Sequence, residues 1–162
     1  MQFLTKQGLR VSAYLDDILG ANPLQHSANQ DALIAAYLLN ALGFFLSMGT
    51  PDKPKSILTP TQTLIHLGFK VDTHRWTLAI PDKKLQATLH LLKQAQKTAT
   101  KNKPITIAQL ASLIGTLQAL MDAVPLARLY TRHLLRLKNQ AKERNNWSDK
   151  IYYTPEALSE IT

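Results

Sequence analysis

The spacing of hydrophobic residues changes near residue 81. Before it, short runs rich in Val, Ile, Tyr and Leu alternate with turn residues, which is typical of strands, and one stretch has helical spacing. After it, apolar residues recur every three or four positions, which predicts helices. We therefore expect an α+β chain, with a strand-and-helix part at residues 1–80 and a run of three helices at residues 81–162.

Two β-hairpins are expected in the first part. Two β-prone runs flank Leu15-Asp16-Asp17, so this hairpin should present both acids at its tip. Residues 63–71 and 76–80 predict a second hairpin, joined through residues 72–75.

A helix and an irregular connection are expected between the hairpins. The helix should begin at Ser27 or Ala28 and stop at Gly43. Residues 48–62 are rich in Pro, Gly, Thr and Lys, which predicts an irregular loop with a short extended piece at residues 57–58. The expected apolar face of the helix consists of Ala32, Leu33, Ala36, Leu39 and Leu42.

Three helices are expected after residue 81. Pro81 suits the first turn of the first helix, whose pattern breaks at residues 97–104. Thr106 and Gln109 have the spacing of a capping box at the start of the second helix, and the third follows Pro125. The residues expected to face inward are Leu85, Leu89 and Leu92, then Ile107, Leu110, Leu113, Ile114, Leu117 and Met121, then Leu126, Leu129, Leu134 and Leu137.

The positive charge is concentrated in the second part. Residues 1–80 contain six Lys and Arg against five acids, which leaves +1, whereas residues 81–162 contain thirteen against six, which leaves +7. A basic domain attracts polyanions, so nucleic acid is the expected partner. Arg128, Arg132 and Arg136 lie at four-residue steps and can follow the phosphates of a duplex, although a solvated helix face has the same pattern.

Composition excludes several other classes. The chain has no cysteine, which removes disulfides, thiolate zinc sites and cysteine nucleophiles. No apolar run approaches the roughly 18 residues of a membrane span, and no secretory leader opens the chain. We expect an intracellular protein, cytoplasmic or nuclear, with no membrane partner. Nothing in the sequence sets its oligomeric state.

The adjacent acids Asp16 and Asp17 have two interpretations. Carboxylates at a hairpin tip can bind Mg²⁺, because a hard cation prefers oxygen ligands and two metals can clamp a phosphoryl transfer. A solvated polar turn is the alternative, since Asp is a common turn residue.

The order of motifs resembles the back half of a reverse transcriptase palm. Tyr14-Leu15-Asp16-Asp17 matches the Tyr-x-Asp-Asp of that family's motif C, and a helix, a Lys-rich loop and Leu67-Gly68-Phe69 follow in the family's order. The resemblance implies that Asp16 ligates the catalytic Mg²⁺, that Asp17 is its less direct partner, and that Tyr14 lies near the primer terminus.

The later motifs of the family also have counterparts. Residues 43–47 and 55–62 look like the motif D region, which implies that Lys55 lies near the incoming triphosphate and protonates the leaving pyrophosphate. Lys53 competes for this role, and two solvated loop lysines remain the alternative. Leu67, Gly68 and Phe69 resemble motif E, the hairpin that grips the primer.

The similarity is strongest to DIRS-type retrotransposon polymerases and covers roughly residues 9–161. Residues 58–85 resemble the corresponding palm stretch, residues 105–138 the helical thumb and connection, and residues 153–161 the passage towards a ribonuclease H domain. The implied fold is a partial polymerase palm, with two β-hairpins and a helix, followed by a three-helix thumb or connection.

The implied reaction is template-directed DNA synthesis from deoxynucleoside triphosphates, with attack by the primer 3′-hydroxyl on the α-phosphate. The family's motif A, with the other metal-binding Asp, and the fingers would lie upstream of Met1, so we expect no polymerisation by this chain alone. Two alternatives stay open: a non-catalytic basic module that binds nucleic acid, and a structural helical domain whose charge keeps it soluble.

Two further residues have open interpretations. Gly68 can let a primer strand approach the backbone closely, or it can be an ordinary glycine in a strand bulge. Trp76 can stack on a base, but a lone Trp in a strand that faces helices is more typical of a core.

Overall fold

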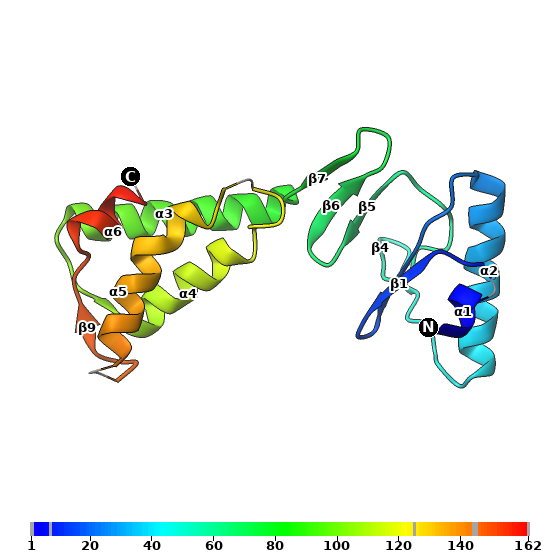
Figure 1. Ribbon diagram of the computed structural model, residues 1–162, viewed down its shortest axis with the longest axis horizontal. Helices are drawn as coiled ribbons and strands as arrows, with labels where there is room; N and C mark the ends of the chain where they lie inside the picture. Colours follow the sequence, from blue (N-terminus) through cyan, green and yellow to red (C-terminus); the bar gives the residue numbers. More distant parts are fainter. Residues whose placement is uncertain (1, 7, 125, 144–145, 162) are drawn as a thin grey trace. The chain divides into compact units, whose positions relative to one another are not determined.

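The computed structural model describes residues 2–6, 8–124, 126–143 and 146–161 (Figure 1). It divides into two compact units, each described by itself. Unit 1 consists of Met1–Leu67 and Val71–Thr77, and unit 2 of Gly68–Lys70 and Leu78–Thr162. Helices and small antiparallel sheets both occur, which confirms the expected α+β class.

The first hairpin forms as the sequence predicts. Strand β1 (Val11–Tyr14) pairs antiparallel with β2 (Asp17–Gly20), in a register that places Tyr14 opposite Asp17. Helix α2 (Gln25–Ala41) follows and contacts β2. A short helix, α1 (Gln2–Lys6), precedes the hairpin, and Leu4 and Leu9 are the buried hydrophobic residues at this end of the unit.

Local hydrogen bonds set both ends of α2. The Asn22 side chain accepts from the Leu24 N–H and donates to Asp31, and the helix begins at Gln25, two or three residues earlier than expected. Gly43 ends it as predicted: with φ of +86° it lets its own N–H bond to Asn40 O and that of Phe44 to Leu39 O. These two hydrogen bonds together form a Schellman motif.

The apolar face expected for α2 is only partly correct. Ala32, Ala36 and Leu39 are half-buried, but Leu33 and Leu42 are exposed and no residue of α2 is fully buried. A two-stranded hairpin covers only a narrow stripe of a helix, which explains why the outer leucines stay in solvent.

The segment from residue 48 to residue 80 contains more strands than expected. Strands β3 (Gly49–Thr50) and β4 (Lys53–Pro54) form a small hairpin around Pro51-Asp52, where an irregular loop was expected. The expected single strand at residues 63–71 is wrong: β5 (Thr63–His66) and β6 (Phe69–Asp72) are separated by a turn at Leu67-Gly68. With β7 (Thr77–Ala79) they form a three-stranded sheet in the order β5-β6-β7.

Unit 2 is built on α4 (Ile107–Gln118), which contacts both α3 (Asp82–Thr100) and α5 (Arg132–Lys142) (Figure 1). Strands β8 (Ile105–Thr106) and β9 (Lys150–Ile151) pair antiparallel, and α6 (Pro155–Ser159) contacts α5. The buried cluster of the unit consists of Ile105, Leu110, Leu113, Ile114, Leu134, Ala157 and Ile161.

The predicted capping box of α4 is confirmed. The Thr106 hydroxyl accepts from the Gln109 N–H at 3.1 Å, and the Gln109 side chain accepts from the Thr106 N–H at 2.9 Å. Helix α4 ends at Gln118, so Met121 lies in the following turn rather than on the helical face. Helix α3 runs on to Thr100, past the expected break, and its Leu89 is exposed.

The third expected helix is two elements. A 3₁₀ turn, η1 (Leu129–Thr131), precedes α5, and Thr131 has the non-helical φ of −128° between them. Leu134 is completely buried, but Leu126 and Leu129 are 68% and 61% exposed, against expectation. Leu126 lies before η1 and has a left-handed φ of +62°, and η1 rotates successive side chains further than an α-helix does, so neither leucine continues the inward face of α5.

A distant carboxylate caps α5. The helix has no hydrogen bond from the side chain of its own N-cap residue, Thr131. Instead Glu160, which follows α6, accepts from the His133 N–H at 2.7 Å and from the Leu134 N–H at 2.9 Å. The carboxylate therefore satisfies two free donors in the first turn and complements the positive end of the helix dipole.

Replacing Glu160 with Ala is expected to lower the free energy of unfolding by about 2 kcal/mol, because two N–H donors lose a charged acceptor. Urea denaturation followed by circular dichroism measures the loss. Glu160→Gln keeps one acceptor oxygen and should lose less, and Asp122→Ala, an exposed carboxylate in the turn after α4, is the matched control. Equal losses for the two Ala variants would contradict the capping role.

Candidate nucleic-acid interface

The acids of the first hairpin lie at its tip. Tyr14 and Asp17 are the last facing pair of the ladder, and Leu15 and Asp16 form the two-residue turn between them. All four side chains are exposed. Leu15 has a φ of +54°, a left-handed conformation that costs a residue with a Cβ about 1–2 kcal/mol. The turn therefore holds Asp16 at the end of the hairpin at some cost in stability.

The two carboxylates are available to an external ligand. No side chain or backbone N–H of the described residues donates a hydrogen bond to Asp16 or Asp17 or forms an ion pair with them. Free carboxylate oxygens fit the donor set that Mg²⁺ prefers. In the part of the chain that the structure describes, no three His, Asp or Glu side chains gather closely enough to hold a metal. Further ligands would have to come from water, substrate or another polypeptide segment.

The second turn lies at Leu67-Gly68, at the start of the expected primer grip. Both residues have left-handed backbone, with φ of +48° and +78°, as a type I′ hairpin turn requires. Gly68 is thus a turn glycine, so the strand-bulge alternative is wrong. Phe69 opens β6 and is half-buried.

Lys84 of α3 holds this turn, and no sequence motif predicts that contact. Its ammonium donates to Gly68 O at 3.5 Å and to Ala119 O at 3.2 Å, and it lies 4.8 Å from the centroid of the Phe69 ring. A Cβ added to Gly68 would lie 3.4 Å from Lys84 Nζ. Gly68 therefore lets another group come close to its backbone, and in this structure that group is the Lys84 ammonium.

Lys55 lies next to the small β3–β4 hairpin. Its N–H donates to Met48 O at 3.1 Å, and the neighbouring Ser56 hydroxyl donates to Ser47 O at 2.9 Å, so residues 55–56 run beside residues 47–48. The Lys55 side chain is exposed, and no hydrogen bond or ion pair links it to Asp16 or Asp17 among the described residues. The side chain of its competitor, Lys53, lies outside the described residues.

The three arginines do not form one helical stripe. Arg132 and Arg136 are one turn apart on α5, whereas Arg128 lies before η1. All three are exposed. The pKa of Glu156 is lowered, chiefly by a hydrogen bond from its own backbone N–H and one from Thr154, with His133 and Arg136 adding to the effect. The acidic side chain of Glu156 thus lies near Arg136, one of the two arginines on α5.

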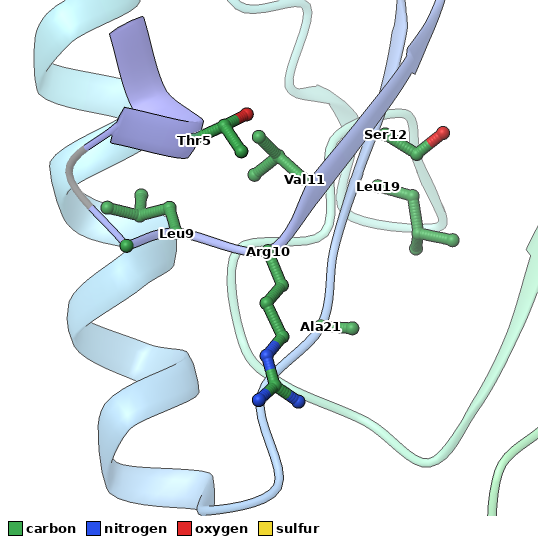
Figure 2. Close-up of a pocket in the computed structure, with 8 residues that line it drawn as sticks. Thr5, Leu9, Arg10, Val11, Ser12, Leu19 and Ala21 are labelled. Carbon is green, nitrogen blue, oxygen red and sulfur yellow. The ribbon is translucent and has the colours of Figure 1, made fainter. Parts of the chain in front are cut away.

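A hollow of about 450 Å³ lies at the other end of the first hairpin (Figure 2). Its lining comes from α1, from the hairpin strands and from the residues that join them, with Leu9, Val11 and Leu19 as apolar side chains. None of the residues expected in a site lines it.

Among the helices that the structure describes, none combines the length and the apolarity needed to cross a lipid bilayer. Comparisons of the chain with family models, with curated proteins and with solved structures find no match.

Proposed function

We propose that this chain forms the part of an RNA-directed DNA polymerase that carries the Tyr-x-Asp-Asp hairpin, the primer-grip turn and a basic helical thumb. The observation that supports the proposal is local: Asp16 lies in a two-residue hairpin turn, and its carboxylate and that of Asp17 are exposed and without a partner among the described residues. A metal-binding hairpin needs carboxylates that are presented and not already bonded.

The chemistry assigned to the chain is nucleotidyl transfer. Asp16 and Asp17 would hold Mg²⁺, which when bound stabilises the charge that develops on the transferred phosphate. Tyr14, opposite Asp17 in the ladder, would contact the primer end, and Lys55 would donate a proton to the pyrophosphate. Leu67, Gly68 and Phe69 would position the primer strand.

This proposal requires a second supplier of carboxylate. Two metal ions about 4 Å apart need more ligands than one hairpin tip provides, so polymerisation is assigned to a polypeptide that includes a further Asp-bearing strand. Translation of the nucleotide sequence upstream of Met1 tests this directly. An open frame that encodes such a strand supports the polymerase, and unrelated sequence before a genuine start codon contradicts it.

A binding module without catalysis is the second candidate. The exposed Arg132 and Arg136 on α5 and the excess positive charge after residue 81 favour it. Phosphate contacts of this kind are independent of sequence and weaken with salt, because binding releases counterions from the nucleic acid.

Binding to a template-primer duplex is expected to weaken steeply as salt rises. Replacing Arg132 and Arg136 together with Ala should reduce the slope of log affinity against log salt by about 2, since each phosphate contact contributes about 0.9. Fluorescence anisotropy over a range of salt concentrations measures it. Lys93→Ala with Lys97→Ala is the matched control, an exposed pair at the same spacing on α3. No binding at low salt would contradict the binding module and count against the thumb assignment.

A further inference from the structure

Trp76 lies on the surface, although its sequence context favoured a core position. It ends the turn between β6 and β7, and its side chain is 88% exposed. The other tryptophan, Trp147, is 49% exposed and lies under the Lys142 ammonium, 4.9 Å from the ring centroid. A large apolar ring left in water contributes little to folding. Trp76 is therefore a candidate for contact with a binding partner.

The backbone at Trp76 is also unfavourable for its residue type. Its φ of +54° lies in the left-handed region, which a side chain with a Cβ rarely adopts. Strained residues persist where the surrounding structure fixes them, and they are common at binding sites.

Hydrogen bonds hold the turn that carries Trp76. The Asp72 carboxylate accepts from the Arg75 N–H at 2.9 Å and from the His74 N–H at 3.0 Å. The bond from Arg75 is the main reason that the pKa of Asp72 is lowered. Thr73 donates from its N–H and its hydroxyl to Gln62 O, at 2.8 and 3.2 Å. The indole is thus presented on an ordered support.

The neighbouring side chains suit a nucleic acid. His74 and Arg75 directly precede the indole, and both are exposed. An aromatic face next to cationic side chains is the arrangement by which proteins bind single strands, with bases stacked on the ring and phosphates near the cations. The bases of a duplex are already stacked on one another, so the indole suits an unpaired base.

We propose that Trp76 stacks on an unpaired base of a single-stranded nucleic acid, with Arg75 near the adjoining phosphate. This inference rests on the proposed function and adds a separate contact to it, for unpaired template rather than for the primer duplex.

Tryptophan fluorescence tests the contact directly. In Trp147→Phe, Trp76 is the single tryptophan of the chain, which has two. Oligothymidylate should quench its emission, whereas an abasic oligonucleotide of equal length and charge should bind without quenching. Equal quenching by both strands would contradict stacking and leave charge alone as the cause.

Anisotropy with labelled strands gives the second measurement. Adding Trp76→Ala should weaken oligothymidylate binding by about tenfold, the effect of losing one stacked base, and leave the abasic strand unaffected. Trp76→Leu keeps apolar bulk without an aromatic face and should lose as much as Ala, while Trp76→Phe should recover part of the affinity.

The outcomes separate this inference from the proposed function. If duplex binding is retained and Trp76→Ala binds oligothymidylate as tightly as the parent, the stacking contact is wrong and the proposed function stands. If the parent binds neither strand nor duplex at low salt, the stacking contact and the nucleic-acid-binding module both fail, whereas the polymerase assignment is decided by the upstream sequence. Unfolding curves of the variants should match, because the ring is exposed.

Discussion

Nucleotide incorporation is expected to fall by about a thousandfold or more when Asp16 is replaced by Asn, in a polypeptide that includes the upstream Asp-bearing strand. An amide keeps the shape of the side chain but carries no negative charge, so it binds Mg²⁺ poorly and stabilises the transferred phosphate less. Asp16 has no partner within the described residues, so its replacement should not disturb the hairpin. Primer extension under single-turnover conditions measures the change.

Two controls define this result. Asp17→Asn should have a smaller effect, because the resemblance makes Asp17 the less direct ligand. Asp31→Asn changes a carboxylate of the same unit that is already bonded to Asn22, and it should leave incorporation within about twofold. Duplex binding by Asp16→Asn should stay close to that of the parent. A variant that still incorporates nucleotides at the parent rate would refute the assigned metal role.

Replacing Leu134 with Ala is expected to lower the free energy of unfolding by about 2–5 kcal/mol. Leu134 is completely buried and belongs to the core cluster with Leu110 and Ile114 of α4. Removing its terminal carbons leaves a cavity where α5 meets α4, and the packed neighbours fill it only in part. Urea denaturation monitored by circular dichroism gives the difference.

Leu126→Ala is the matched control for this substitution. The side chain is 68% exposed, so its truncation should change the free energy of unfolding by no more than about 0.5 kcal/mol. The sequence pattern assigned both leucines to the same inward face. A loss at Leu126 equal to that at Leu134 would restore that expectation and contradict the packing described above.

Features fixed by neighbouring residues could be predicted from the sequence. The capping box of Thr106 and Gln109 spans four residues, the glycine stop at Gly43 needs only the helix end, and the Asp16 turn follows from the two runs around it. The mixed α+β class followed from hydrophobic spacing alone. In each case a short-range rule decides the local backbone.

Features that depend on distant residues were missed or wrong. Residues 63–71 have the pattern of one strand, because no neighbouring residue indicates that Leu67 adopts a left-handed backbone. The contacts of Lys84 with Gly68 and Ala119 join residues 16 and 35 positions apart. Of the two interpretations left open for Trp76, the core position is wrong, because the ring lies at the end of a turn rather than within a strand and is exposed. Periodicity gives a residue's face on an element, but not what covers that face.

The carboxylate of Glu160 has a consequence for the order in which the chain can fold during synthesis. Helix α5 ends at Lys142, yet the acceptor for its first-turn donors is made later, after α6. While the nascent chain still lacks residue 160, those N–H groups have only water as partner. Helix α5 should therefore reach its full stability only after residue 160 has left the ribosome, so that unit 2 is completed late in synthesis.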